Sequence, residues 1–226
     1  MEYLFDTANL EQLETYGRFI PITGVTSNPS IVKKEGKIDF FSHMKKIRKL
    51  IGMEKTLHIQ VTGQDFDSMM ADAEAILEKV DDQVYIKVPV TLPGLQVIRA
   101  LKARGVHVTA TAIYTQMQGF LAMEAGADYI APYYNRMENS GIDPQEVIAS
   151  FAQMIKTYGY ATKILAASFK NMGQVNKAFL AGAQTATMGL DIVQGAFENA
   201  MIQKAVDDFA QDWSSVFGDC LISQMK

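Results

Sequence analysis

The sequence is poor in cysteine and histidine, and this scarcity excludes several kinds of site. Of the 226 residues only Cys220 is a cysteine, so the chain has neither an internal disulfide nor a CxxC pair. The three histidines, His43, His58 and His107, form no HxxxH or HxH pattern. The nucleophile motif GxSxG is missing as well. We therefore expect chemistry that needs no metal and no cofactor.

Long apolar runs and an excess of positive charge are also lacking. No apolar run approaches the ~18 residues of a membrane span, and the first ten residues, MEYLFDTANL, lack the features of a signal peptide. The formal net charge of −4 argues against a nucleic-acid partner, although a local basic pocket remains possible. Together with the lone cysteine, these features predict a cytoplasmic protein that binds neither membrane nor nucleic acid.

Short runs rich in strand-forming residues alternate with longer helical patterns, as in parallel βαβ proteins. An open doubly wound sheet is the alternative to a barrel, but GxGxxG and P-loop motifs are both absent. The near-even spacing of eight runs favours an α/β protein with one (β/α)8 TIM-barrel domain over residues 1–226. The eight predicted strands are Tyr3–Asp6, Gly24–Asn28, Leu57–Thr62, Val84–Val90, His107–Ile113, Tyr129–Tyr134, Lys163–Phe169 and Thr185–Leu190.

The segments between these runs carry the signals of helices and of helix ends. Apolar residues recur at helical spacing over Asp67–Val80, Leu95–Ala103 and Gln118–Ala125. Asp143 and Pro144 are typical of a helix start. Four glycines that precede predicted strands fit helix C-termini with positive φ, namely Gly105, Gly126, Gly159 and Gly182.

The chain continues past the eighth strand for longer than one barrel helix requires. We interpret residues 201–226 as a C-terminal helical arm. Phe209, Trp213 and Phe217 follow one another at intervals of four and so share one helical face. This face fits packing on the chain's own barrel or on a neighbouring subunit, and the sequence leaves both open.

Each of seven predicted strands carries polar side chains where a barrel collects its functional groups. Catalytic residues of such barrels gather at the C-terminal ends of the strands. We therefore expect one shared site from the polar residues of these runs, which are Asp6, Thr26, Asn28, Gln60, Lys87, Thr111, Tyr133 and Ser168.

Lys87 is the most informative of these residues because it interrupts an otherwise apolar strand. A barrel strand has helices on one side and the core on the other, so neither face is wet. Burial favours the neutral amine over the ammonium ion, and the neutral amine is the form that attacks a ketone. The resulting iminium can stabilise the carbanion formed when an adjacent C–C bond breaks. A purely structural pairing of Lys87 with Asp6 or another neighbour remains the alternative.

The other residues have roles that suit this chemistry. Asp6 can stabilise the charged intermediates or hold a sugar hydroxyl. Thr26 and Asn28 can orient further hydroxyls, and Gln60, Thr111 and Tyr133 can hold a water that moves protons. We therefore predict Lys87, Asp6, Tyr133, Gln60 and Thr111 as catalytic residues.

Four segments of the sequence resemble the signatures of the short transaldolases, and the resemblance runs nearly end to end. The segments are Phe5-Asp6-Thr7-Ala8, Gly24-Val25-Thr26-Ser27-Asn28-Pro29-Ser30, Ile86-Lys87-Val88-Pro89 and Ala166-Ala167-Ser168-Phe169-Lys170. Members of this family are barrels that cleave ketose phosphates through a lysine Schiff base. The resemblance implies that Lys87 forms it, that Arg136 binds the substrate phosphate, and that Ser168 assists Arg136.

The family contains aldolases that release dihydroxyacetone from fructose 6-phosphate and transaldolases that transfer it. Gln60 and Tyr133 match the aldolases, whereas transaldolases typically have glutamate and phenylalanine there. We therefore expect an aldolase with sugar-phosphate substrates, with transaldolase as the close alternative and a non-catalytic sugar-phosphate-binding barrel as the remote one. The resemblance further implies a homo-decamer of two five-membered rings. His58 receives no role.

Overall fold

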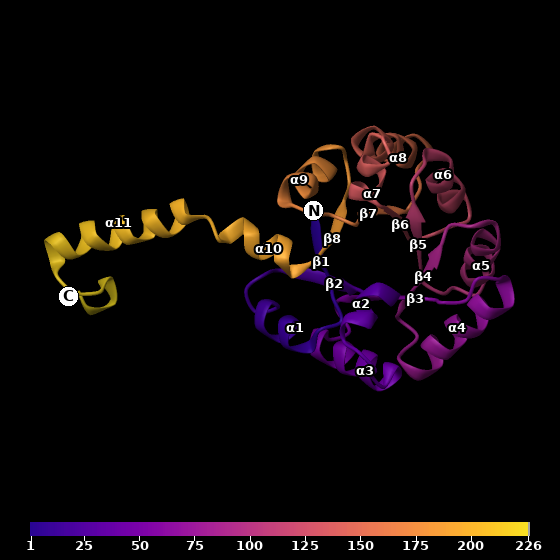
Figure 1. Cartoon of the computed structure of the whole chain (residues 1–226), viewed down its shortest axis with the longest axis horizontal. Coiled ribbons are helices and arrows are strands. Elements are labelled where there is room, and N and C mark those ends of the chain that lie inside the picture. The colour runs from indigo at the N-terminus through magenta and orange to yellow at the C-terminus, as the bar shows by residue number, and fades with distance from the viewer. Residues whose placement is uncertain (226) are drawn as a thin grey trace.

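Eight parallel strands close into a barrel within residues 1–225, the part of the chain that the computed structural model describes (Figure 1). Neighbours in sequence are neighbours in the sheet, and β1 closes the barrel by pairing with β8. The predicted (β/α)8 fold is confirmed. The strands are β1 (Glu2–Asp6), β2 (Ile22–Thr26), β3 (Thr56–Gln60), β4 (Tyr85–Pro89), β5 (Val108–Ile113), β6 (Tyr129–Pro132), β7 (Lys163–Ala166) and β8 (Thr185–Met188).

Helices surround the barrel (Figure 1), and every helix from α1 to α10 has at least one buried residue, whereas α11 has none. In α4, for example, Met69, Ala73 and Ile76 are buried at helical spacing. The helices are α1 (Leu10–Tyr16), α2 (Pro29–Lys34), α3 (Phe40–Ile51), α4 (Phe66–Lys79), α5 (Leu92–Ala103), α6 (Gln116–Glu124), α7 (Tyr134–Asn139), α8 (Pro144–Tyr158), α9 (Met172–Leu180), α10 (Leu190–Phe197) and α11 (Ala200–Phe217), followed by a 3-10 turn at Ile222–Gln224. None of these described helices is long and apolar enough to cross a membrane.

Helix ends follow the signals in the sequence. Asp143 caps α8 by accepting hydrogen bonds from the backbone of Gln145 and Glu146, and Pro144 occupies the first turn. The four glycines expected at helix C-termini all have positive φ, between 71° and 105°. These local signals therefore fix where several helices stop and the chain turns back toward the barrel.

Six strands end earlier than predicted, and three of these early ends involve a predicted site residue. Asn28 is the N-cap of α2 rather than part of β2, because its side chain accepts from the backbone N–H groups of Ser30 and Ile31. Tyr133 directly precedes α7, beyond the end of β6. Ser168 lies beyond β7 and has φ of 63°, which a strand does not allow. These three residues therefore lie on the loops that rim the barrel.

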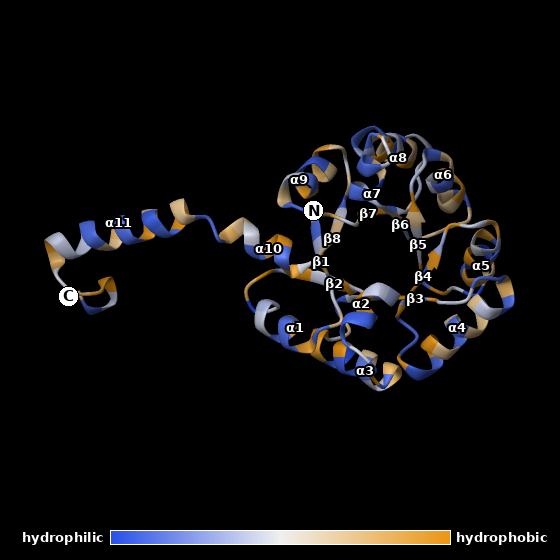
Figure 2. Cartoon of the chain, in the orientation of Figure 1, coloured by the Kyte–Doolittle hydropathy of each residue, from blue (hydrophilic) through white to orange (hydrophobic). Residues whose placement is uncertain are grey.

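The helix α11 extends away from the barrel, and none of its residues is buried (Figure 1). Packing of the predicted arm on its own barrel is therefore wrong. Phe209 is 71% exposed, while Trp213 contacts Phe217 and donates a hydrogen bond to the carbonyl of Cys220. Figure 2 shows hydrophobic and hydrophilic residues interspersed along this helix. The last residue of the predicted arm, Lys226, lies outside the described residues.

Candidate active site

A cavity of about 310 Å³ opens at the C-terminal ends of the strands and collects most of the predicted site. Seven of the nine predicted residues line it: Asp6, Asn28, Gln60, Lys87, Tyr133, Arg136 and Ser168. The other two, Thr26 and Thr111, lie behind the wall, and each has a hydrogen bond to a residue that lines the cavity. The chain thus brings polar side chains from six strands or their following loops to one place.

Lys87 is buried, with 2% of its surface exposed, at the base of this cavity. In the sheet it lies between Gln60 of β3 and Thr109 of β5, and its sequence neighbours Ile86 and Val88 are completely buried. Among residues 1–225 the amine takes part in no ion pair. The structural alternative of a direct pair with Asp6 is therefore wrong. A buried amine beside an open cavity can act as a nucleophile toward a bound carbonyl.

Asp6 lies at the end of β1 and is held by Thr26, which in turn contacts Thr187. The Thr26 hydroxyl is 2.5 Å from one carboxyl oxygen of Asp6 and 2.7 Å from the hydroxyl of Thr187 on β8. Burial raises the pKa of Asp6, against the opposing effects of the positive charge on Lys87 and the hydrogen bond from Thr26. A carboxyl group with a raised pKa, close to an amine, is suited to exchange protons with bound substrate.

Tyr133, Thr111 and Gln60 are the residues predicted to hold a water, and they come from β3, β5 and the position just after β6. The hydroxyl groups of Tyr133 and Thr111 are 3.0 Å apart. The Gln60 side-chain oxygen is buried and has no hydrogen-bond partner within the described residues. A buried acceptor without a partner is energetically costly, so Gln60 has a free position for a water or a substrate hydroxyl.

The backbone around the cavity is strained at two positions. Ala112 and Ser168, with φ of 57° and 63°, are the two non-glycine residues with positive φ in residues 1–225, and both line the cavity. Ala112 lies where the pairing of β5 with β6 shifts register. Strained conformations of this kind gather at functional sites. Nothing in the sequence indicates either of them.

Arg136 stands at the rim of the cavity on α7. Its guanidinium lies 4.9 Å from the ring centre of Tyr133 and donates a 3.1 Å hydrogen bond to the hydroxyl of Tyr114. The forked guanidinium is suited to bind a phosphate group. Tyr114 was not among the residues predicted from the sequence, because it lies one residue beyond the predicted fifth strand.

The histidines are held in structural positions. His58 is completely buried, with its ring nitrogens 2.7 Å and 2.9 Å from the hydroxyls of Thr109 and Thr56. Its ring stacks on Tyr85 at 4.7 Å. Burial, with the charges of Lys87 and Arg48, lowers the pKa of His58 well below the usual range. Within residues 1–225 no cluster of three or more His, Cys, Asp or Glu side chains could hold a metal ion.

Comparison with known proteins agrees with the resemblance of the four segments. Residues 3–220 match the family model described as Transaldolase/Fructose-6-phosphate aldolase. A protein of Streptococcus pneumoniae (strain ATCC 700669 / Spain 23F-1), named as a probable fructose-6-phosphate aldolase, is 53% identical over 213 residues, covering 94% of this chain and 96% of its own length. The chain therefore belongs to the transaldolase/fructose-6-phosphate aldolase family and is an enzyme of the aldolase and transaldolase type.

Proposed function

We propose that the enzyme is a class I aldolase that reversibly cleaves fructose 6-phosphate into dihydroxyacetone and glyceraldehyde 3-phosphate. The observation that carries the proposal is Lys87, a buried amine that faces a polar cavity and has no ion pair with any residue from 1 to 225. The amine attacks the C2 carbonyl, and loss of water from the carbinolamine gives an iminium. The positive nitrogen then accepts the electrons of the C3–C4 bond as that bond breaks.

Proton movements in this scheme fall to the residues around the amine. A water held by Tyr133, Gln60 and Thr111 takes the proton of the C4 hydroxyl as glyceraldehyde 3-phosphate leaves, and returns it to C3 of the enamine. Asp6, with its raised pKa, exchanges protons with the carbinolamine and stabilises the iminium. Hydrolysis then frees dihydroxyacetone and regenerates Lys87. None of these steps requires a metal ion.

Substrate binding divides between the two sides of the cavity. Asn28 orients the hydroxyls of the dihydroxyacetone unit near Asp6, and Thr26 contributes from behind the wall by holding the Asp6 carboxyl. Arg136 with Ser168 binds the phosphate at the rim. The tyrosine at position 133 favours release over transfer, because its hydroxyl holds the water that protonates the enamine. Transaldolase activity remains the alternative, since the same Schiff base serves both reactions.

One assay separates these activities. The enzyme is given fructose 6-phosphate alone, and glyceraldehyde 3-phosphate is measured with a coupled dehydrogenase. An aldolase produces glyceraldehyde 3-phosphate and dihydroxyacetone in equal amounts without any acceptor. Production that begins only after erythrose 4-phosphate is added identifies a transaldolase instead.

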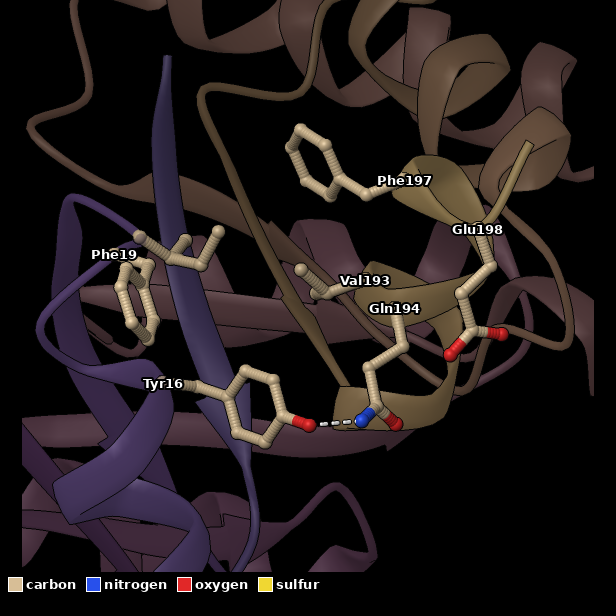
Figure 3. Close-up of a pocket in the computed structure, with 7 residues that line it drawn as sticks. Tyr16, Phe19, Val193, Gln194, Phe197 and Glu198 are labelled. Atoms are coloured by element: carbon tan, nitrogen blue, oxygen red, sulfur yellow. Dashed lines mark hydrogen bonds between the residues drawn. The ribbon is translucent and has the colours of Figure 1, made fainter. Parts of the chain in front are cut away.

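We also propose that α11 packs on a neighbouring copy of the chain, within a decamer. Phe209, Val206 and Phe217 are exposed along this helix. Near the root of the arm an apolar cavity of about 370 Å³ is lined by Tyr16, Phe19, Ile20, Val193, Gln194, Phe197 and Glu198 (Figure 3). In this close-up the rings of Phe19 and Phe197 stand on opposite sides of the cavity, and the two are 75% and 66% exposed. Such a surface suits an apolar helix from another subunit.

Light scattering tests the assembly. We expect a mass of ten times the 25.0 kDa of one chain at micromolar concentration. Removal of residues 199–226 should yield smaller species that stay folded, because α11 buries no residue against the barrel. A monomeric mass for the full chain contradicts the proposal.

Location and partners follow as proposals from composition alone. With a net charge of −4 and one cysteine, we infer a cytoplasmic enzyme that acts on small sugar phosphates and binds no nucleic acid. Cell fractionation and a filter-binding assay with DNA and RNA test these two points.

A further inference from the structure

Tyr114 contacts two residues of the site without lining the cavity itself. It follows β5 and is half-buried. Its hydroxyl accepts the 3.1 Å hydrogen bond from Arg136, and its ring meets the ring of Tyr133 edge-on at 5.6 Å. Tyr114 has no role in the proposed catalytic steps.

Arg136 needs such a contact because it is exposed and lies at the rim. An arginine side chain that is free in solvent loses considerable rotamer entropy when it is fixed on a ligand. Here the guanidinium is already fixed from two sides, by the ring of Tyr133 and the hydroxyl of Tyr114. The hydrogen bond from Arg136 to Tyr114 also raises the pKa of the guanidinium. Arg136 is therefore oriented before any phosphate arrives.

Tyr114 is itself fixed by the loop after β5. Its backbone N–H donates a 3.0 Å hydrogen bond to the side-chain oxygen of Gln118, which also accepts from the N–H of Thr115. The amide nitrogen of Gln118 donates at 3.1 Å to the carbonyl of Val90, the residue after the strand that carries Lys87. The register shift at Ala112 lies in the same segment. This segment therefore places Tyr114 in a defined position relative to the site.

We propose that Tyr114 is a positioning residue that holds Arg136 ready for the substrate phosphate and so sets the preference for phosphorylated over non-phosphorylated aldehydes. The inference rests on the proposed function, since the phosphate is that of glyceraldehyde 3-phosphate. The measurement that tests it is the ratio of the kcat/KM values for a phosphorylated and a non-phosphorylated aldehyde. A general structural role would lower the activity with both equally.

The test replaces Tyr114 with phenylalanine, which removes the hydroxyl and keeps the ring. Aldol addition of dihydroxyacetone is measured with glyceraldehyde 3-phosphate and with glyceraldehyde. We expect the ratio of the two kcat/KM values to fall about 2- to 10-fold, the range for losing the immobilisation of one side chain. The matched control is Tyr160→Phe, because the hydroxyl of Tyr160 bonds to Glu124 away from the cavity. The control should keep the wild-type ratio.

A double variant separates this effect from other causes. In an Arg136→Ala background, Tyr114→Phe should leave the ratio where Arg136→Ala has already put it. An unchanged ratio in the single variant, or an equal loss with both aldehydes, overturns the inference. So does a further fall of the ratio in the double variant.

Binding of inorganic phosphate decides the inference without turnover. By calorimetry, we expect the phosphate Kd of Tyr114→Phe to rise about 2- to 10-fold, and that of Tyr160→Phe to stay at the wild-type value. Equal Kd values in all three proteins, or no binding by the wild type, overturn the role of Tyr114. If the wild type adds dihydroxyacetone to neither aldehyde, the proposed function fails, and the phosphate Kd values still decide the role of Tyr114.

Discussion

The two ends of the barrel interior are both polar, but their polar groups are used differently. At the N-terminal end Lys163 pairs with Glu2 at 2.7 Å, and the ring of Tyr85 stacks between His58 and His107, at 4.7 Å from each. At the C-terminal end the amine of Lys87 has no ion pair within the described residues, and the oxygen of Gln60 has no partner there. The Lys163–Glu2 pair is partly exposed, but His58 is buried and has partners, so a buried polar side chain does not by itself mark a site. A site is marked instead by buried polar groups that line a cavity and have no partner among the described residues.

The two lysines offer the largest test of this contrast. Lys87→Met should lower cleavage of fructose 6-phosphate to below about 1% of wild type, because Lys87 is the only described lysine that lines the cavity. The fold should persist, since the substitution removes a buried amine that forms no ion pair in the described part of the chain. Activity is measured with the coupled assay, and folding by circular dichroism.

Lys163→Met is the matched control for that variant. It breaks the ion pair with Glu2 at the other end of the barrel, so it should lower Tm and leave the chemistry in place. If Lys163→Met loses activity while Lys87→Met keeps substantial activity, the active site lies at the N-terminal end of the barrel and the proposed site is wrong.

Tyr133→Phe should give the next largest effect. It removes one anchor of the proposed water, and general acid–base assistance is worth roughly 10²–10⁴-fold if proton transfer limits release. Release of dihydroxyacetone should then fall by more than transfer to erythrose 4-phosphate, because the longer-lived enamine can meet a second aldehyde. Tyr85→Phe, the same change at the N-terminal end, is the control. An equal fall in release and transfer would mean that Tyr133 serves only the shared steps.

His58 should affect stability rather than chemistry, and the pH-dependent part of its effect should appear in acid. Its pKa in the folded protein lies well below 6.5, so below about pH 6.5 the unfolded chain binds a proton that the folded chain does not. The stabilisation from neutral His58 is fully present above that pH and is lost as the pH falls, by up to about 1.4 kcal/mol per pH unit. Urea unfolding from pH 7.5 to 5 should therefore show a shallower loss for His58→Gln. Identical pH profiles for the two proteins would contradict this.

Chelation should have the smallest effect. If the polar groups at the C-terminal end act as acid, base and nucleophile, activity in EDTA should equal activity without it. The measurement is the coupled assay after dialysis against EDTA. Lost activity that a divalent metal ion restores would show that these groups act as ligands.

The sequence predicted the fold well because its signals are local. Alternating strand and helix patterns, the Asp143 cap and the four glycines each depend on a few neighbouring residues, and all are present in the structure. The ends of the strands were less accurate. Asn28 and Ser168 were placed in strands because a strand pattern does not show where a side-chain cap or a positive φ interrupts it.

The site was predictable where it depended on residue type, and less so where it depended on three-dimensional contacts. A lysine in an apolar barrel strand has few explanations, so the buried position of Lys87 beside a cavity was predictable from the sequence. Tyr114 reaches Arg136 across 22 residues, and nothing in the sequence around either one indicates that contact. The path of α11 away from the barrel was likewise not predictable, because it depends on which barrel surfaces the other helices already cover.

Borohydride trapping tests the Schiff base on Lys87 most directly. The protein is incubated with fructose 6-phosphate, reduced with sodium borohydride, digested, and analysed by peptide mass spectrometry. We expect one substrate-derived adduct, on the side-chain nitrogen of Lys87, and no adduct on that peptide without borohydride or in Lys87→Met. An adduct on a different lysine, or active enzyme that yields no adduct at all, would contradict the proposed mechanism.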